Sequence, residues 1–270
     1  MTAYPSTLKL IQILNVVFLL ITLYVNYLAN ALPLNGKDTG QLSDQYPNLF
    51  TPAGLTFSVW GVIYLGLLAF AVYQSLPLFE RKWADEVNPV VERIGWLFVL
   101  TCVLNGAWLF AWHYEQLTLS VLIMVLFLGT LILINKRLQS NHFESSPRVK
   151  WLVQLPFAVY WGWITIATIA NVTAWLVYEN WQGFGLPQSV WAIVLIATGA
   201  FITVTVLRRT QHWAYGLVVL WAFAGIVIKR YSVPGTPQMN VIVATVLAML
   251  VVGYFIVRSI RVSARSGSFR

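Results

Sequence analysis

Three residues that could form a binding surface recur at helical spacing within residues 161–171, which read WGWITIATIAN. Trp163, Ala167 and Asn171 follow one another at intervals of four, so a helix would carry them on one face, with Thr168 beside them. The stripe combines an aromatic wall, a gap and a hydrogen-bonding amide. Such a gap is closed by a neighbouring helix or filled by a ligand, and the residues alone favour neither alternative.

Other tryptophans and amides also fall deep inside apolar segments: Trp60, Trp108, Asn15 and Asn105. Trp163 itself lies roughly 20 Å along its helix from Lys150, beyond the depth of an interfacial aromatic belt. An indole N–H or an amide in hydrocarbon is costly unless it is hydrogen-bonded, so we expect these side chains to face protein or ligand. For each amide the alternative is a bond between helices, which contributes about 0.6 to 2 kcal/mol.

The sequence offers little for catalysis or for a metal site. His113, His142 and His212 are far apart, Cys102 is the single cysteine, and no HExxH, CxxC, P-loop or GxGxxG motif occurs. We therefore expect no catalytic residue, no metal and no resident cofactor. The apolar segments also lack a charged residue near their centres, which disfavours an ion-coupled transporter.

The segments that carry these residues are long enough to cross a membrane. Hydrophobic residues make up 59% of the 270, charged residues 10%, and the mean hydropathy is +0.72. A bilayer core of roughly 30 Å needs about 20 apolar residues per helix. We predict an all-α polytopic membrane helix bundle of eight spans, with no separate soluble domain, at residues 9–29, 53–76, 93–112, 117–135, 150–177, 189–207, 212–229 and 238–258.

The net charge of +8 follows this topology. If eight spans alternate, 14 of the 17 Lys and Arg residues fall on one side, and the other side receives only Lys37, Lys229 and Arg230. The positive-inside rule then places both termini in the cytoplasm, and because topology explains the charge, a nucleic-acid partner is disfavoured. The first segment also has features of a signal peptide, but its apolar run is longer than usual, which favours a retained helix.

Three motifs give the chain a resemblance to a known family. The second span contains PAGLTFSVWGVIY, in which Pro52, Val59, Trp60, Ile63 and Tyr64 match; the third contains LNGAW, with Leu104, Asn105 and Trp108; the fifth contains WITIATIAN, with Trp163, Ala167, Thr168 and Asn171. In order and spacing these resemble the translocator protein, or TspO/MBR, family of tryptophan-rich sensory proteins. The resemblance covers roughly residues 8–178.

The resemblance implies a five-helix core at residues 1–178, followed by a three-helix extension at 179–270 with a basic tail. The family core encloses a pocket for tetrapyrroles such as protoporphyrin, which would be lined by Trp60, Tyr64, Asn105, Trp108, Trp163, Ala167 and Asn171. The loop at residues 30–52 would be its lid. The resemblance further implies a bacterial plasma membrane and a possible homodimer.

The chain also departs from the family pattern. Gly54 stands where the family usually has a tryptophan, Leu109 and Phe110 replace a pair of prolines, and Pro156 lies one turn early. No Lys or Arg follows Tyr178 closely, so sterol binding is disfavoured. The favoured function is a membrane binding or sensory protein for a planar hydrophobic ligand. The alternatives are a permease for a small hydrophobic solute and a purely structural subunit. Some relatives have been credited with light-dependent degradation of porphyrin, a reaction that in this chain would have to use Trp chemistry.

Overall fold

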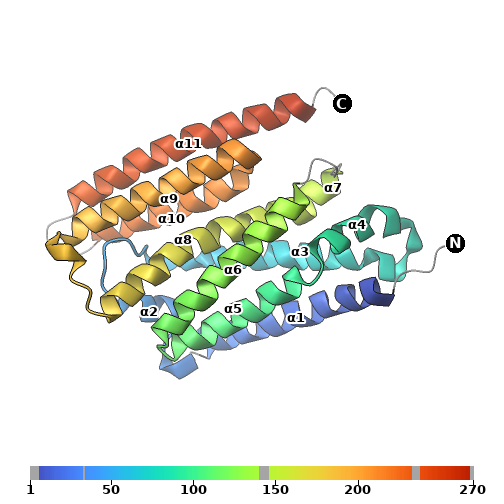
Figure 1. The fold of residues 1–270 in the computed structure, drawn as a ribbon, viewed down its shortest axis with the longest axis horizontal. Helices are drawn as coiled ribbons and strands as arrows, with labels where there is room; N and C mark the ends of the chain where they lie inside the picture. Colours follow the sequence, from blue (N-terminus) through green and yellow to red (C-terminus); the bar gives the residue numbers. More distant parts are fainter. Residues whose placement is uncertain (1–5, 33, 140–145, 233–237, 268–270) are drawn as a thin grey trace. The chain divides into compact units, whose positions relative to one another are not determined.

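The computed structural model describes residues 6–32, 34–139, 146–232 and 238–267 (Figure 1). Across these residues the chain is helical and contains no strand, which confirms the predicted all-α class. His142 lies outside the described residues. Within the described part of the expected lid, α1 ends at Ala31 and the short helices η1 (Leu34–Gly36) and α2 (Thr39–Asp44) follow. A further 3-10 helix, η2 (Gly54–Ser58), leads into the second span.

Among the described residues, seven helices are long and apolar enough to cross a membrane. They are α1 (Ser6–Ala31), α3 (Val59–Phe79), α6 (Leu117–Leu138), α8 (Leu155–Tyr178), α9 (Gln188–Thr210), α10 (Trp213–Ser232) and α11 (Met239–Gly267). An eighth span results if α4 (Ala84–Ile94), with the η3 turn (Arg81–Trp83), and α5 (Leu97–His113) count as one broken segment, bent by 52°. The bend falls at Gly95, whose φ of +54° is readily adopted only without a side chain. The predicted helical membrane bundle is thus confirmed.

Helix α4 lies almost entirely between the predicted spans 53–76 and 93–112, where no helix was predicted. Its buried residues Val87, Val90, Val91 and Ile94 follow the spacing of an amphipathic helix, while its charged residues lie on other faces. The sequence therefore contained the signal for this helix.

The chain groups into two compact units, each described here by itself. Unit 1 comprises residues 1–38 and 60–160, and unit 2 comprises residues 39–59 and 161–270. Helix α8 is continuous through the division, so its first residues belong to unit 1 and its remainder to unit 2. The domain boundary at residue 178 came from the resemblance and stays a prediction.

The interior of unit 1 is built around three fully buried phenylalanines from three helices. Phe70, Phe98 and Phe157 meet edge to face, with ring centroids 5.0 to 5.9 Å apart. Nearby, Gly66 on α3 admits Pro156 of α8, because a Cβ on the glycine would lie 3.0 Å from the proline Cβ. A π-helical turn, η4 (Lys150–Gln154), follows the one-turn helix α7 (Pro147–Val149) and immediately precedes this proline segment.

Buried amides join α1 to α3 within unit 1. Gln12 Nε2 donates to the Gln74 carbonyl at 2.8 Å, and Gln74 Nε2 donates to the Gln12 carbonyl at 3.0 Å. Asn15 Nδ2 adds a bond to Gln74 Oε1 at 3.3 Å. These contacts realise the interhelical role that was one of the two alternatives for Asn15.

The interior of unit 2 depends on close helix approaches. Helices α9, α10 and α11 pack side by side (Figure 1). A Cβ on Gly162 of α8 would lie 2.8 Å from the carbonyl oxygen of Tyr215 on α10, so only glycine permits this approach. One turn along α8, Thr165 Oγ1 accepts a hydrogen bond from the Tyr215 hydroxyl at 3.0 Å. The Trp161 ring meets the Tyr215 ring at 4.8 Å.

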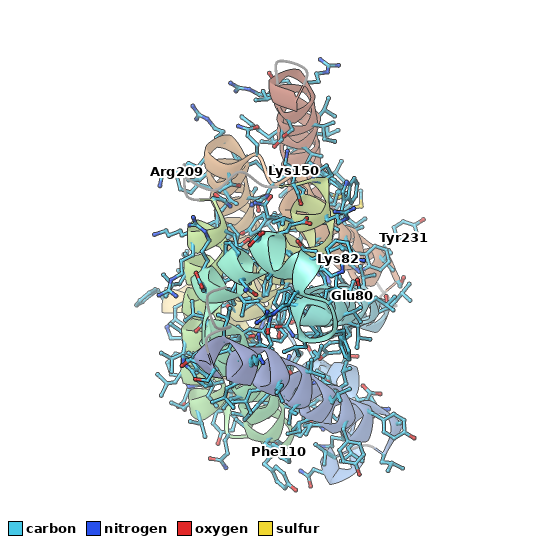
Figure 2. All side chains as sticks on the ribbon, turned by 90° about the vertical axis from the view of Figure 1, so that its right-hand side faces the viewer. Glu80, Lys82, Phe110, Lys150, Arg209 and Tyr231 are labelled. Atoms are coloured by element: carbon cyan, nitrogen blue, oxygen red, sulfur yellow. The ribbon has the colours of Figure 1, made fainter. Side chains whose placement is uncertain are left out.

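Charged side chains gather at the ends of the helices. In unit 1, Lys82 pairs with Glu80, and both lie at the end of the helices where Lys150 also projects (Figure 2). Glu86 of α4 accepts hydrogen bonds from Ser146 at 2.5 Å and from Arg148 at 3.2 Å. The Glu86 contacts join two connections that alternating spans place on the same side of the membrane.

Candidate functional site

Four aromatic rings form a continuous ladder in unit 1. Trp60 stacks on Tyr64 at 5.4 Å between centroids and on Trp108 at 6.5 Å, and Trp108 stacks on Trp112 at 5.9 Å, with interplanar angles of 19° to 29°. The edge of Tyr160 meets the Trp60 ring at 5.9 Å. Trp108 and Trp112 are buried, whereas Trp60 and Tyr64 are half-buried.

Two helices supply the ladder in matching pairs. Trp60 and Tyr64 are four residues apart on α3, and Trp108 and Trp112 are four apart on α5, so each pair stacks along one helix face. Sequence reasoning identified Trp60, Tyr64 and Trp108 but missed Trp112. Its spacing from Trp108 was the signal that could have found it.

Behind the ladder lies a fully buried hydrogen-bond network. Asn105 Oδ1 accepts from Asn26 Nδ2 at 2.8 Å, and Asn105 Nδ2 donates to the Tyr160 hydroxyl at 3.0 Å. Asn26 also donates to the Thr22 carbonyl of its own helix at 2.9 Å. Because Asn105 lies three residues before Trp108 on α5, this network fixes the helix that presents the second half of the ladder.

Unit 1 therefore brings together four of the seven predicted site residues, Trp60, Tyr64, Asn105 and Trp108. Neither the ladder nor the network contains an Asp, Glu, Lys or Arg side chain, so the arrangement is suited to a neutral aromatic surface and not to acid–base work. Among the described residues, no group of three or more His, Cys, Asp or Glu side chains could hold a metal ion.

The other three predicted residues lie on α8 in unit 2. Trp163 is 2% exposed and meets Phe57 edge to face at 5.7 Å. Ala167 is half-buried and Asn171 is buried. Phe57 was not identified from the sequence, and the contact joins residues too distant in the chain for spacing to reveal it.

The hydroxyl groups of this stretch are used within the protein. Thr165 Oγ1 donates to the Trp161 carbonyl at 2.9 Å and accepts from Tyr215, while Thr168 Oγ1 donates to the Ile164 carbonyl at 2.6 Å. Trp161, Gly162 and Thr165 thus belong to the packing against α10. The stripe of Trp163, Ala167 and Asn171 runs beside them on the same helix.

Comparison with protein families shows which family the whole chain matches. The TSPO-like protein family matches residues 12–257. This chain belongs to that family. The match extends through α9, α10 and α11, so these helices are part of what the TSPO-like protein shares with its family, beyond the five spans that the motifs cover.

Membership and the apolar helices together make this TSPO-like protein an integral membrane protein of the sensory or binding type. Neither the curated proteins nor the solved structures compared with the chain gave a match.

Proposed function

We propose that this TSPO-like protein binds a planar, largely apolar ligand, with a tetrapyrrole such as protoporphyrin as the favoured class. The observation that carries the proposal is the ladder of Tyr64, Trp60, Trp108 and Trp112, whose rings lie nearly parallel within a membrane-spanning unit. Parallel aromatic faces favour a flat π system, because offset stacking is worth about 0.5 to 1.5 kcal/mol per pair beyond the area buried.

The residues have different parts in this proposal. Trp60 is the half-buried centre of the ladder and offers its ring to the ligand. Asn105 is fully buried and engaged by Asn26 and Tyr160, so it holds the ladder in place instead of bonding the ligand. The resemblance assigns Trp163, Ala167 and Asn171 of α8 to ligand binding as well.

Titration of the purified protein with protoporphyrin in lipid nanodiscs tests the proposal, with the shift of the porphyrin absorption band as readout. We expect saturable binding to the wild type. Trp60→Phe should raise the Kd by roughly three- to tenfold, since it weakens the stacking of one ring on the ligand, which is worth about 0.5 to 1.5 kcal/mol.

Trp96→Phe is the matched control, because Trp96 is 50% exposed and lies outside the ladder. Equal affinities of the wild type and Trp60→Phe would refute binding at the ladder. Equal losses in the two variants would show that the effect is not local. A flux assay in liposomes separates the permease alternative, since a binding protein retains the porphyrin without moving it down a gradient.

We also infer a bacterial plasma membrane location with both termini in the cytoplasm, supported by the distribution of Lys and Arg, and a homodimer, supported by the resemblance. Protease digestion of inverted and right-side-out vesicles tests the orientation through cleavage of the basic C-terminal tail.

A further inference from the structure

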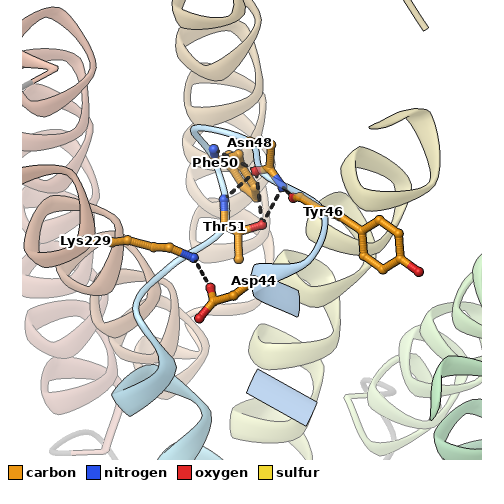
Figure 3. Close-up of polar contacts among 6 residues, drawn as sticks. All are labelled: Asp44, Tyr46, Asn48, Phe50, Thr51 and Lys229. Carbon is orange, nitrogen blue, oxygen red and sulfur yellow. Dashed lines mark hydrogen bonds and ion pairs between the residues drawn. The ribbon is translucent and has the colours of Figure 1, made fainter. Parts of the chain in front are cut away.

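A segment of the first connection is fastened to helix α10 at three points. Lys229 Nζ pairs with Asp44 Oδ1 at 2.5 Å (Figure 3). The Gly225 carbonyl accepts a hydrogen bond from the Ala53 N–H at 3.0 Å. Trp221 Nε1 donates to the Thr56 carbonyl at 3.0 Å.

The three α10 residues form one stripe. Trp221, Gly225 and Lys229 are four residues apart in turn, so they share the helix face that meets residues 44–56. Gly225 is required for this fit: a Cβ there would lie 1.9 Å from Thr56 Oγ1 and 3.0 Å from the Pro52 Cβ. Any side chain at position 225 would therefore force residues 52–56 and α10 apart.

The same segment touches α8 at both of its ends. Phe57 meets Trp163 edge to face at 5.7 Å, and Tyr46 meets Tyr178 at 6.3 Å. Trp163 and Tyr178 are separated by about 22 Å along α8, and residues 46–57 span up to about 36 Å when extended. The segment therefore has the length to run along α8 from Tyr178 back to Trp163, past Asn171 and Ala167.

Within the segment, a local turn keeps the chain in this path. Asn48 Oδ1 accepts hydrogen bonds from the N–H groups of Phe50 and Thr51 at 3.0 and 2.8 Å, and the Tyr46 side chain points away from Asp44 and Lys229 (Figure 3). Phe50 and Thr51 are almost fully buried. The segment is therefore a packed element and is held by more than its ends.

We propose that residues 44–57 form a strap over the Trp163, Ala167 and Asn171 stripe of α8, and that the Trp221, Gly225 and Lys229 stripe of α10 is the fastening that sets how readily the strap opens. The C-terminal helices thereby regulate access to the ligand-binding face of α8. This regulatory role rests on the proposed function, because it requires that a ligand binds. The contacts between the strap and α10 are independent of any ligand.

Hydrogen exchange of the full-length protein in nanodiscs tests the fastening without any ligand. In Gly225→Ala the added methyl displaces the strap, so we expect exchange of the Ala53 amide and of peptides within residues 44–56 to accelerate about tenfold or more, as loss of one such hydrogen bond allows. Trp221→Phe keeps an aromatic ring, though a smaller one, and removes the N–H, and should accelerate the same peptides to a smaller extent. Peptides from α6 should be unchanged in both variants and report that the protein has folded.

Gly253→Ala is the matched control, because a Cβ on this α11 glycine meets nothing within 4 Å. Unchanged exchange of residues 44–56 in Gly225→Ala and Trp221→Phe would overturn the fastening, as would an equal acceleration in Gly253→Ala.

Protoporphyrin dissociation, followed by stopped flow in the same samples, tests the regulation. It should accelerate in Gly225→Ala by a factor similar to that of the exchange. Faster exchange with an unchanged dissociation rate would overturn regulation by the strap. Failure of the proposed function would instead appear as absent porphyrin binding in the wild type, with the exchange result still deciding the fastening.

Discussion

The bond between Asn105 and Tyr160 allows a direct measurement of how the ladder is held. Asn105→Leu removes both network bonds and leaves the buried Tyr160 hydroxyl without its donor, which should cost about 2 to 4 kcal/mol of unfolding free energy. Tyr160→Phe deletes only the hydroxyl and keeps the ring contacts with Trp60 and Phe127, so its cost should be about 0.5 to 1.5 kcal/mol.

The interaction between the two residues follows from the double variant. Because either substitution already breaks the bond, the combined loss should be smaller than the two single losses together by about 0.6 to 1.7 kcal/mol, the range found for hydrogen bonds between membrane helices. Reversible unfolding in mixed micelles of increasing dodecyl sulfate content, followed by circular dichroism, supplies the four free energies.

The exposed Tyr114 provides the control, since Tyr114→Phe removes a hydroxyl from a side chain that is 55% exposed and should change stability by less than about 0.5 kcal/mol. A coupling energy indistinguishable from zero between Asn105 and Tyr160 would refute the bond. The ladder would then have to be held by ring packing alone.

Three further perturbations probe other parts of the protein. Gly162→Ala places a methyl 2.8 Å from the Tyr215 carbonyl and should lower the unfolding free energy by about 1 to 3 kcal/mol, whereas Gly106→Ala, with open space around its Cβ, should be neutral or stabilising; equal effects would contradict the close approach. Gln74→Leu removes the two bonds that the Gln74 side chain makes to α1 and should cost about 1 to 3 kcal/mol in the same assay, and a change below about 0.5 kcal/mol would show that they are redundant. His212 lies in the connection before α10, and burial lowers its pKa from the ordinary 6.5 to about 4. Between pH 6.5 and about 4, the histidine therefore binds a proton more readily in the unfolded chain than in the folded one. Stability should therefore fall as the pH is lowered from 7 to 5, and the fall should be smaller in His212→Gln; an unchanged slope would exclude this histidine as its source.

The elements of this fold were largely predictable from the sequence because lipid imposes length and apolar composition on each span. The spans beginning near residues 9, 117 and 189 agree with α1, α6 and α9 to within a few residues at their ends. The helical spacing of Trp60 with Tyr64 likewise anticipated a shared face. These are local properties, and local spacing reports them directly.

Contacts between distant segments could not be read in this way. The bond from Trp221 to the Thr56 carbonyl joins residues 165 apart in the chain, and its acceptor is a backbone atom that every residue possesses. The close approach of Pro52 and Thr56 to α10 is marked in the sequence only by Gly225, and a glycine there is equally consistent with ordinary packing between helices. The contacts that join residues 44–56 to α10 are therefore visible only in the three-dimensional structure, although the resemblance already implied a lid in the loop at residues 30–52.

The stretch at residues 161–171 carries packing residues and the proposed binding stripe on adjacent faces of one helix. Gly162 and Thr165 face Tyr215 of α10, whereas Trp163 meets Phe57, so adjacent faces of the helix have different partners. The threonine hydroxyls are consumed by bonds within the protein, as is the amide of Asn105 in unit 1. Since hydrogen-bonding groups already engaged gain little from a ligand, recognition has to rely mainly on aromatic faces and shape. Such a site should therefore discriminate among ligands by flatness and ring size more than by polar substituents, and a metal-free porphyrin should compete with its own methyl ester at similar affinity.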